Sequence, residues 1–130
     1  MNIRPGDRYK GRGETKLKLP NIFEKQVPTR KFRAGEMIFA SGEPADVMYV
    51  VKAGRVDIVK GQEVIETVGA EGFFGELALV DSGPRGAAAR AQTDCELAPI
   101  NDKQFQFMVS ETPFFSLVVM RELAARLRRA

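Results

Sequence analysis

The chain has 130 residues, a formal net charge of +3 and a hydrophobic fraction of 44%, which is the composition of a single globular domain. It has no histidine and one cysteine, Cys95, which excludes an internal disulfide bond, histidine-based catalytic triads and zinc sites. No apolar run approaches the roughly 20 residues of a membrane helix. These features favour a protein of a reducing compartment, the cytoplasm, with no enzymatic activity, no metal and no cofactor.

Positive charge is concentrated near the N-terminus. Residues 1–33 carry a net +7, whereas residues 34–130 carry −4. We interpret residues 1–19 as a basic arm, too polar to fold alone, and residues 20–130 as the folded domain. The arm has no apolar signal core. A solvated arm is the first interpretation, and contact with nucleic acid or an acidic membrane surface is the alternative.

Short, closely spaced apolar segments follow the arm. A short helix is predicted from Pro20 to Val27, and Pro28 ends it. Glycine-separated segments then show the pattern of an all-β sandwich or barrel. The predicted strands are residues 30–33, 36–39, 47–52, 56–59 and 64–68, with a turn over residues 41–46.

Residues 72–89 combine small side chains with one acid and one base. A helix beginning after Gly75 would leave the backbone N–H groups of residues 76–78 free to bind an anion. Arg85 adds a planar charged fork that suits a phosphate. Glu76 would repel an anion, so it must bind another part of a ligand, such as a hydroxyl group. A phosphate with a nearby hydroxyl describes a ribose phosphate.

Two more strands are predicted after this segment, over residues 86–91 and 95–100. The three alanines at 87–89 favour a helix by propensity alone. We nevertheless predict a strand, because small side chains let the backbone approach a ligand closely. Cys95 is interpreted as a small buried apolar residue.

Two helices complete the predicted domain. Asn101 and Gln104 have the spacing of a capping box, and Thr112-Pro113 is a second helix-start signal. In the last helix, Glu122 and Arg126 form an i, i+4 pair. The same helix carries an apolar stripe, interpreted as core or as partner contact, with an amphipathic membrane helix as the alternative: Leu117, Met120, Leu123, Ala124 and Leu127.

Residues 72–89 resemble the phosphate-binding cassette of cyclic nucleotide-binding domains, as in cyclic-AMP-dependent kinase regulatory subunits, catabolite activator proteins and cyclic-nucleotide-gated channels. We call these residues the cassette. The matching residues are Phe74-Gly75-Glu76-Leu77-Ala78-Leu79, Pro84-Arg85 and Ala87. Residues 33–36, 41–46, 49–51 and 54–56 also fall in the family's order. The resemblance implies a mainly β fold: an eight-stranded jelly roll with a short N-terminal helix and two C-terminal helices.

The resemblance also implies roles for individual residues. Glu76 would take the ribose 2′-hydroxyl, Arg85 would pair with the cyclic phosphate, and backbone N–H groups near Ala78 and Gly86 or Ala87 would complete the cradle. The predicted ligand-binding residues are therefore Phe74, Gly75, Glu76, Leu77, Ala78, Pro84, Arg85, Gly86 and Ala87.

Two features bear on the choice of base. Family members that favour cyclic GMP often carry threonine at the position of Gly86, so this glycine favours cyclic AMP or weak discrimination. The family's last helix covers the base as a lid. The candidates for the covering residue, by position only, are Arg121, Leu123, Ala124 and Leu127.

The resulting hypothesis is a stand-alone cyclic nucleotide sensor, a monomer or weak dimer, that repacks its C-terminal helices and signals to an unknown protein effector. No DNA-binding domain or membrane segment is recognised, and a natural single-domain protein is favoured over a piece of a longer one. The alternatives are a same-fold regulator with a different ligand or none, and an interaction module that uses the arm on nucleic acid. A cupin-type enzyme is disfavoured by the absence of histidine.

Overall fold

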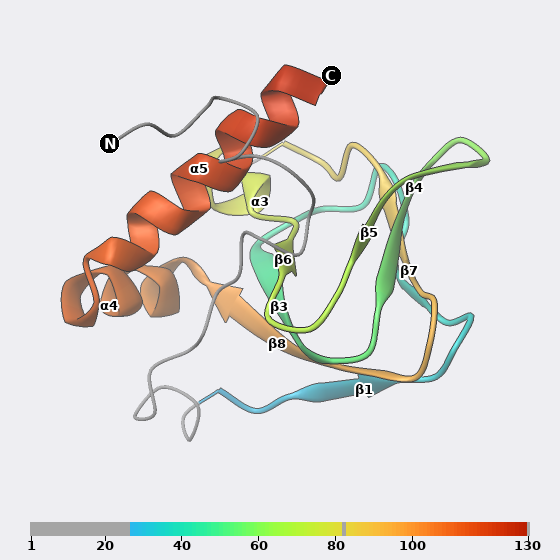
Figure 1. Cartoon of the computed structure of the whole chain (residues 1–130), viewed down its shortest axis with the longest axis horizontal. Helices are drawn as coiled ribbons and strands as arrows, with labels where there is room; N and C mark the ends of the chain where they lie inside the picture. Colours follow the sequence, from blue (N-terminus) through green and yellow to red (C-terminus); the bar gives the residue numbers. More distant parts are fainter. Residues whose placement is uncertain (1–26, 82, 130) are drawn as a thin grey trace, which may run out of the picture.

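Glycine-separated strands pair into two four-stranded antiparallel sheets in the computed structural model, which describes residues 27–81 and 83–129 (Figure 1). One sheet has the order β1-β8-β3-β6 and the other has the order β2-β7-β4-β5. The strands are β1 (Arg30–Phe32), β2 (Met37–Phe39), β3 (Val47–Ala53), β4 (Val56–Lys60), β5 (Glu63–Val68), β6 (Phe73–Phe74), β7 (Ala88–Ala91) and β8 (Cys95–Asn101). This arrangement confirms the predicted jelly roll.

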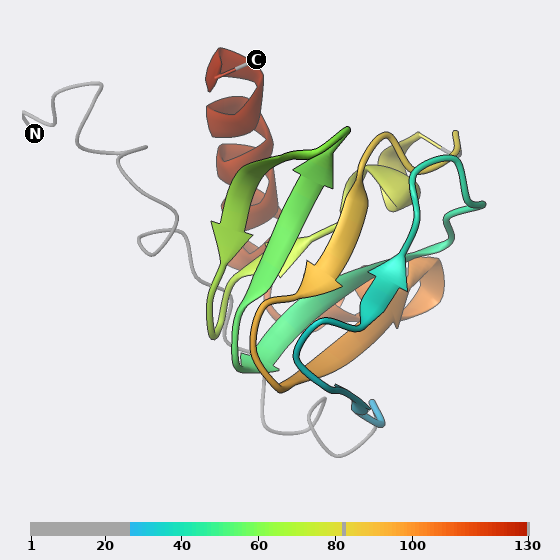
Figure 2. The same cartoon turned by 90° about the vertical axis from the view of Figure 1, so that its right-hand side faces the viewer.

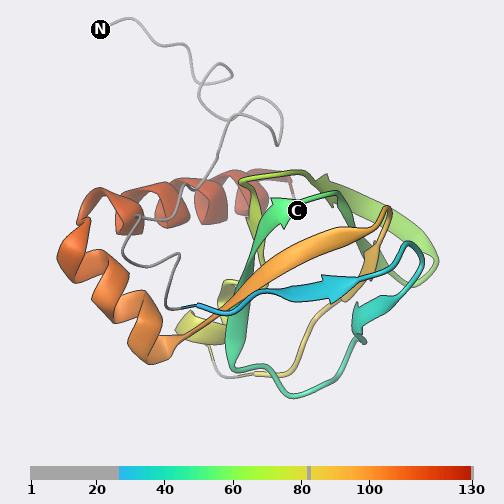
Figure 3. The same ribbon diagram turned by 90° about the horizontal axis from the view of Figure 1, so that it is seen from below.

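The two sheets face each other, and helices cover the outer side of one of them (Figures 2 and 3). Strand β3 shows why its sequence is apolar throughout. Tyr49 and Val51 face the core between the sheets, whereas Met48 and Val50 pack in the cluster that contains the helices' buried residues. Because both faces of β3 are covered, alternation with polar residues is absent.

Strand β7 forms although its sequence is poor in strand-forming residues. It pairs with both β2 and β4, and Ala89 and Ala91 are fully buried between the sheets. Pairing on both sides and burial therefore outweigh the helix propensity of alanine. The pattern did not locate β6, because a two-residue strand is too short to show a period.

Three helices are present in the described part of the chain: α3 (Leu77–Val80), α4 (Asp102–Glu111) and α5 (Phe114–Arg129). The predicted capping box is formed, with the side chains of Asn101 and Gln104 each accepting from the other's backbone N–H at 2.9 and 2.8 Å. The helix predicted before Pro28 lies outside the described residues except for Val27, which is buried. No described helix is long and apolar enough to cross a membrane.

Helix α5 buries one face and exposes another. Phe115, Val119, Glu122 and Ala125 are buried on its inner side. Three residues of the predicted apolar stripe are exposed and are called the outer stripe: Leu117 (36% exposed), Met120 (56%) and Leu127 (76%). These three residues are therefore not part of the core, whereas Leu123 packs against it, so the predicted stripe is divided between core and exposed surface.

Candidate functional site

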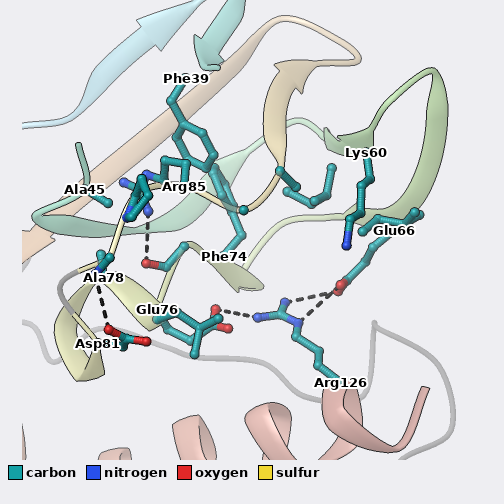
Figure 4. Close-up of a pocket in the computed structure, with 18 of the residues that line it drawn as sticks. Phe39, Ala45, Lys60, Glu66, Phe74, Glu76, Ala78, Asp81, Arg85 and Arg126 are labelled. Carbon is teal, nitrogen blue, oxygen red and sulfur yellow. Dashed lines mark hydrogen bonds and ion pairs between the residues drawn. The ribbon is translucent and has the colours of Figure 1, made fainter. Parts of the chain in front are cut away.

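A cavity of about 570 Å³ lies between the cassette, the β4–β5 hairpin and α5 (Figure 4). All nine residues predicted to bind ligand line it. The other lining residues are Phe39, Ala45, Ile58, Lys60, Ile65, Glu66, Asp81, Gly83, Arg126 and Arg129. The structure thus brings every predicted site residue to a single cavity.

Gly75 makes room for the arginine of the cassette. Its φ is +74°, a left-handed conformation that favours glycine. A Cβ atom added at Gly75 would lie 2.7 Å from Arg85 Nη1. Glycine at this position therefore serves both the turn into α3 and the close approach of the guanidinium.

The backbone of Arg85 is fixed by the turn over residues 41–46. Its N–H donates to the carbonyl of Glu43 at 2.9 Å, and its carbonyl accepts from the N–H of Gly42 at 2.7 Å. Two segments that lie about 40 residues apart in the sequence are therefore tied together at the cavity. This turn, predicted from its residue types, sets the position of the arginine.

The side chain of Arg85 is fixed as firmly as its backbone. Nη1 donates to the carbonyl of Gly75 at 3.1 Å, Nη2 donates to the carbonyl of Val47 at 2.7 Å, and the guanidinium stacks 4.0 Å from the ring of Phe39. Burial lowers the pKa of Arg85 from its ordinary value. Its buried Nε has no acceptor among the described residues. The cavity wall therefore holds a buried cation in which one nitrogen, Nε, has no hydrogen-bond partner among the described residues.

The first turn of α3 differs from the prediction in one respect. The N–H of Ala78 donates to the carbonyl of Gly75 at 3.2 Å, and the N–H of Leu79 donates to the carbonyl of Glu76 at 3.1 Å. These i to i+3 bonds tighten the turn. The sequence had predicted a free N–H group at Ala78. In the structure this N–H group is engaged in a hydrogen bond within the turn.

Glu76 is buried (4% exposed) and forms an ion pair with Arg126 of α5. Only its Oε1 is used in this pair, and Oε2 accepts no hydrogen bond from the described residues. A carboxylate buried beside a cavity with one unused oxygen can accept a hydrogen bond from a ligand hydroxyl.

Arg126 forms ion pairs and hydrogen bonds with several acceptors at the end of the cavity opposite Arg85 (Figure 4). It contacts Glu66 of β5 at 3.0 and 3.2 Å and Glu122 at 2.9 Å, and it donates to the carbonyl of Phe73 at 2.7 Å. Burial alone would lower the pKa of Arg126, but the charges of Glu76 and Glu66 outweigh burial and raise it above its ordinary value.

Sequence reasoning placed the last helix over the ligand, but it missed Arg126 and Arg129 as the residues of α5 that line the cavity, and it missed the contribution of β5. The predicted Glu122–Arg126 pair is formed, but the i, i+4 spacing could not show that it faces inward. Arg121, Leu123, Ala124 and Leu127, the candidates for a lid, are not among the lining residues. Among the described residues, no group of three or more His, Cys, Asp and Glu side chains could hold a metal ion.

Comparisons with known proteins point to a single family. The family model described as cyclic nucleotide-binding domain matches residues 29–112. A CRP-like cAMP-activated global transcriptional regulator of Mycobacterium tuberculosis is 34% identical over 110 residues, covering 81% of this chain and 49% of the relative. The chain thus spans about half the length of this curated relative.

Two solved structures have the same fold. The catabolite activator protein of Thermus thermophilus has a TM-score of 0.75 and 26% identity, covering 84% of this chain and 54% of its own. A protein from a cyclic-GMP-dependent signalling pathway in bacterial phytopathogenesis has a TM-score of 0.72 and 26% identity, covering 88% of this chain and 97% of its own. With the family match over residues 29–112, these findings show that the chain belongs to the cyclic nucleotide-binding domain family.

Proposed function

We propose that this domain is a non-enzymatic sensor that binds a cyclic nucleotide, with cyclic AMP favoured over cyclic GMP, and signals through its C-terminal helices. The observation that carries the proposal is the placement of Arg85 and Glu76. Both are buried in the wall of one cavity, and each has one polar atom without a hydrogen-bond partner among the described residues.

The two residues would bind opposite kinds of group. Nε of Arg85 is a buried donor on a cation, and leaving such a donor unpaired is costly. A phosphate oxygen beside it would supply the missing acceptor. Oε2 of Glu76 would accept a hydrogen bond from the ribose 2′-hydroxyl. A phosphate, which is negatively charged, could not take the place of this hydroxyl. A cyclic nucleotide carries both groups on one sugar.

Gly86 supports the preference for cyclic AMP. It lines the cavity, and no atom lies within 4 Å of a Cβ atom built there. The position has room for a larger residue, but glycine itself has no side chain that could donate a hydrogen bond to a guanine. The relatives include both a cAMP-activated regulator and a protein of a cyclic-GMP-dependent pathway, so the preference rests on Gly86.

Signalling would use α5, because this helix contributes Arg126 and Arg129 to the cavity and exposes the outer stripe on its other side. A ligand shifts the helix only if its affinity differs between two helix positions. We propose that a protein effector contacts the helices, and that the domain itself is a monomer or weak dimer.

Calorimetric titration of the purified protein with cyclic AMP and then cyclic GMP tests the proposal. We expect binding at micromolar or lower concentrations, tighter for cyclic AMP. Arg85→Ala should weaken binding by about 10- to 100-fold, the value of a hydrogen bond to a charged group. The matched control is Arg90→Ala, since Arg90 lies in β7, its side chain is 42% exposed and it does not line the cavity.

Arg85 also stabilises the fold through Val47 and Gly75, so thermal unfolding of each variant must accompany the titration. Arg85→Lys provides a second variant that keeps the charge and removes the planar fork. No heat with either nucleotide, from folded protein free of bound ligand, would contradict the proposal. It would favour the alternative of a regulator with the same fold and a different ligand.

A further inference from the structure

We propose that the outer stripe of α5 is the docking surface for an acidic amphipathic helix of a partner protein. This inference rests on the proposed contact between an effector and the helices, and it names the chemistry of that effector. Two observations carry it: the spacing of the apolar residues along α5 and the sign of the charges beside them.

The outer stripe, together with Ala124, has the spacing of a helix-packing seam. Leu117, Met120, Ala124 and Leu127 follow one another at intervals of three, four and three residues, which is the a and d spacing of a coiled coil. Ala124 is half-buried between the exposed Met120 and Leu127, and a small residue at this point allows another helix to approach closely. A narrow line of this kind suits a single helix, whereas a helix that lies in a membrane needs a broad apolar face.

The charges beside the outer stripe are positive. Arg121 stands one helical turn after Leu117, and therefore on the same side of α5. Arg128 stands one turn after Ala124, so the two arginines follow one flank of the stripe. The single acid of α5, Glu122, is 3% exposed and lies on the inner side of the helix. A partner that matches this surface carries carboxylates along one edge of its apolar face.

Arg121 is held at the surface in a position to meet a carboxylate. Its guanidinium lies 5.4 Å from the centre of the Phe114 ring, a cation–π contact within the helix. Stacking occupies a face of the guanidinium and leaves its N–H edges for a planar acceptor. Phe114 is itself 57% exposed and adds apolar surface at the beginning of α5.

A second copy of this chain does not provide the matching charge. In an antiparallel pair of α5 helices, the flanking arginines of one copy would face those of the other. In a parallel pair, Arg121 would face Ser116 and Arg128 would face Leu123. Neither arrangement places a carboxylate beside an arginine, whereas an acidic helix can do so in both directions.

The probe for this surface is a synthetic helical peptide of about three heptads, with leucine at positions a and d and glutamate at positions e and g. A matched peptide carries lysine in place of glutamate, and like charges at e and g keep either peptide from pairing with itself. Fluorescence anisotropy of the labelled peptides is measured with the whole chain and without nucleotide. We expect the acidic peptide to bind about 10-fold more tightly, because ion pairs form in one complex and like charges meet in the other.

Reversing the charge of the flank should reverse this preference. The double variant Arg121→Glu/Arg128→Glu should bind the basic peptide about 10-fold more tightly than the acidic one, and Arg121→Glu alone should remove most of the preference. The matched control is Lys31→Glu/Lys103→Glu, which changes the net charge equally at exposed residues of β1 and α4 and should keep the wild-type preference. Thermal unfolding verifies that each variant is folded.

Three results would overturn the inference. The first is equal binding of the two peptides, or binding of neither. The second is binding to vesicles of phosphatidylserine and phosphatidylcholine that Leu127→Ser abolishes, which would assign the outer stripe to a membrane surface. The third is self-association in sedimentation that the same variant abolishes, which would assign the stripe to a second copy. Failure of the proposed function is distinguishable, because a titration with cyclic nucleotide and no peptide would then give no heat.

Discussion

Gly86, the residue after Arg85, lines the cavity without a side chain. Because no atom lies within 4 Å of a Cβ atom built there, a larger residue fits without displacing neighbours. We expect Gly86→Thr to raise the affinity for cyclic GMP relative to cyclic AMP by about 2- to 10-fold, the value of one ordinary hydrogen bond. Calorimetric titration of the variant with both nucleotides checks this.

The control is Gly86→Val, which has the shape of threonine without its hydroxyl. It should leave the ratio of the two affinities unchanged. An equal shift in both variants would mean that bulk, and not a hydrogen bond to the base, changes the preference.

Residue chemistry explains which parts of the site could be predicted. Glu76 and Arg85 stand in a short segment whose glycines, acid and base have a recognisable spacing, so local sequence was sufficient to single them out. Arg126 and Glu66 lie 50 and 10 residues from Glu76, and only the tertiary fold brings the three side chains together. No local pattern encodes such a contact.

Among the elements, the two-residue connection between β3 and β4 has a glycine with close neighbours in another segment. Gly54 has a φ of +88°, and a Cβ atom there would lie 2.3 Å from the carbonyl oxygen of Asp94 and 2.6 Å from Cβ of Cys95. Gly61, in the next turn, also has a positive φ of +65°, but a Cβ atom there meets nothing within 4 Å. The two glycines therefore separate backbone strain from steric overlap.

We expect Gly61→Ala to lower the free energy of unfolding by about 1 kcal/mol, the cost of a left-handed alanine. Gly54→Ala should lower it by about 3 kcal/mol or more, because overpacking adds to the strain. Urea denaturation of both variants measures the difference. Equal losses would show that the β3–β4 turn can relax away from Asp94.

At the same scale, the strands were predicted where burial follows a pattern. Val47–Ala53 could be located because both of its faces are covered by apolar packing. Ala88–Ala91 was predicted against its own propensity, from the need for close backbone approach, and its two-sided pairing explains the outcome. Phe73–Phe74 could not be located, because two residues form a strand here only through β3.

At the scale of the whole molecule, α5 is the element that would transmit ligand binding away from the cavity. We expect a saturating cyclic nucleotide to slow amide hydrogen exchange in the cassette and in the C-terminal half of α5, which carries Arg126 and Arg129. Exchange measured at short times by mass spectrometry checks this. Strand β1 contributes no residue to the cavity and is the internal control.

Protection of the cassette without any change in α5 would show that the ligand binds and the helix does not respond. Protection of neither would agree with a calorimetric titration that gives no heat. The measurement therefore separates ligand binding from its transmission.

The outer stripe of α5 has a thermodynamic consequence. Leu117, Met120 and Leu127 are exposed on the helix whose opposite face carries Arg126 to the cavity. If a protein bound to this stripe favours one helix position, it must change the nucleotide affinity by the same factor by which the nucleotide changes the protein's affinity. The half-saturating nucleotide concentration would then depend on how much of that protein is present, so cells with different amounts of it would respond to the same nucleotide level differently.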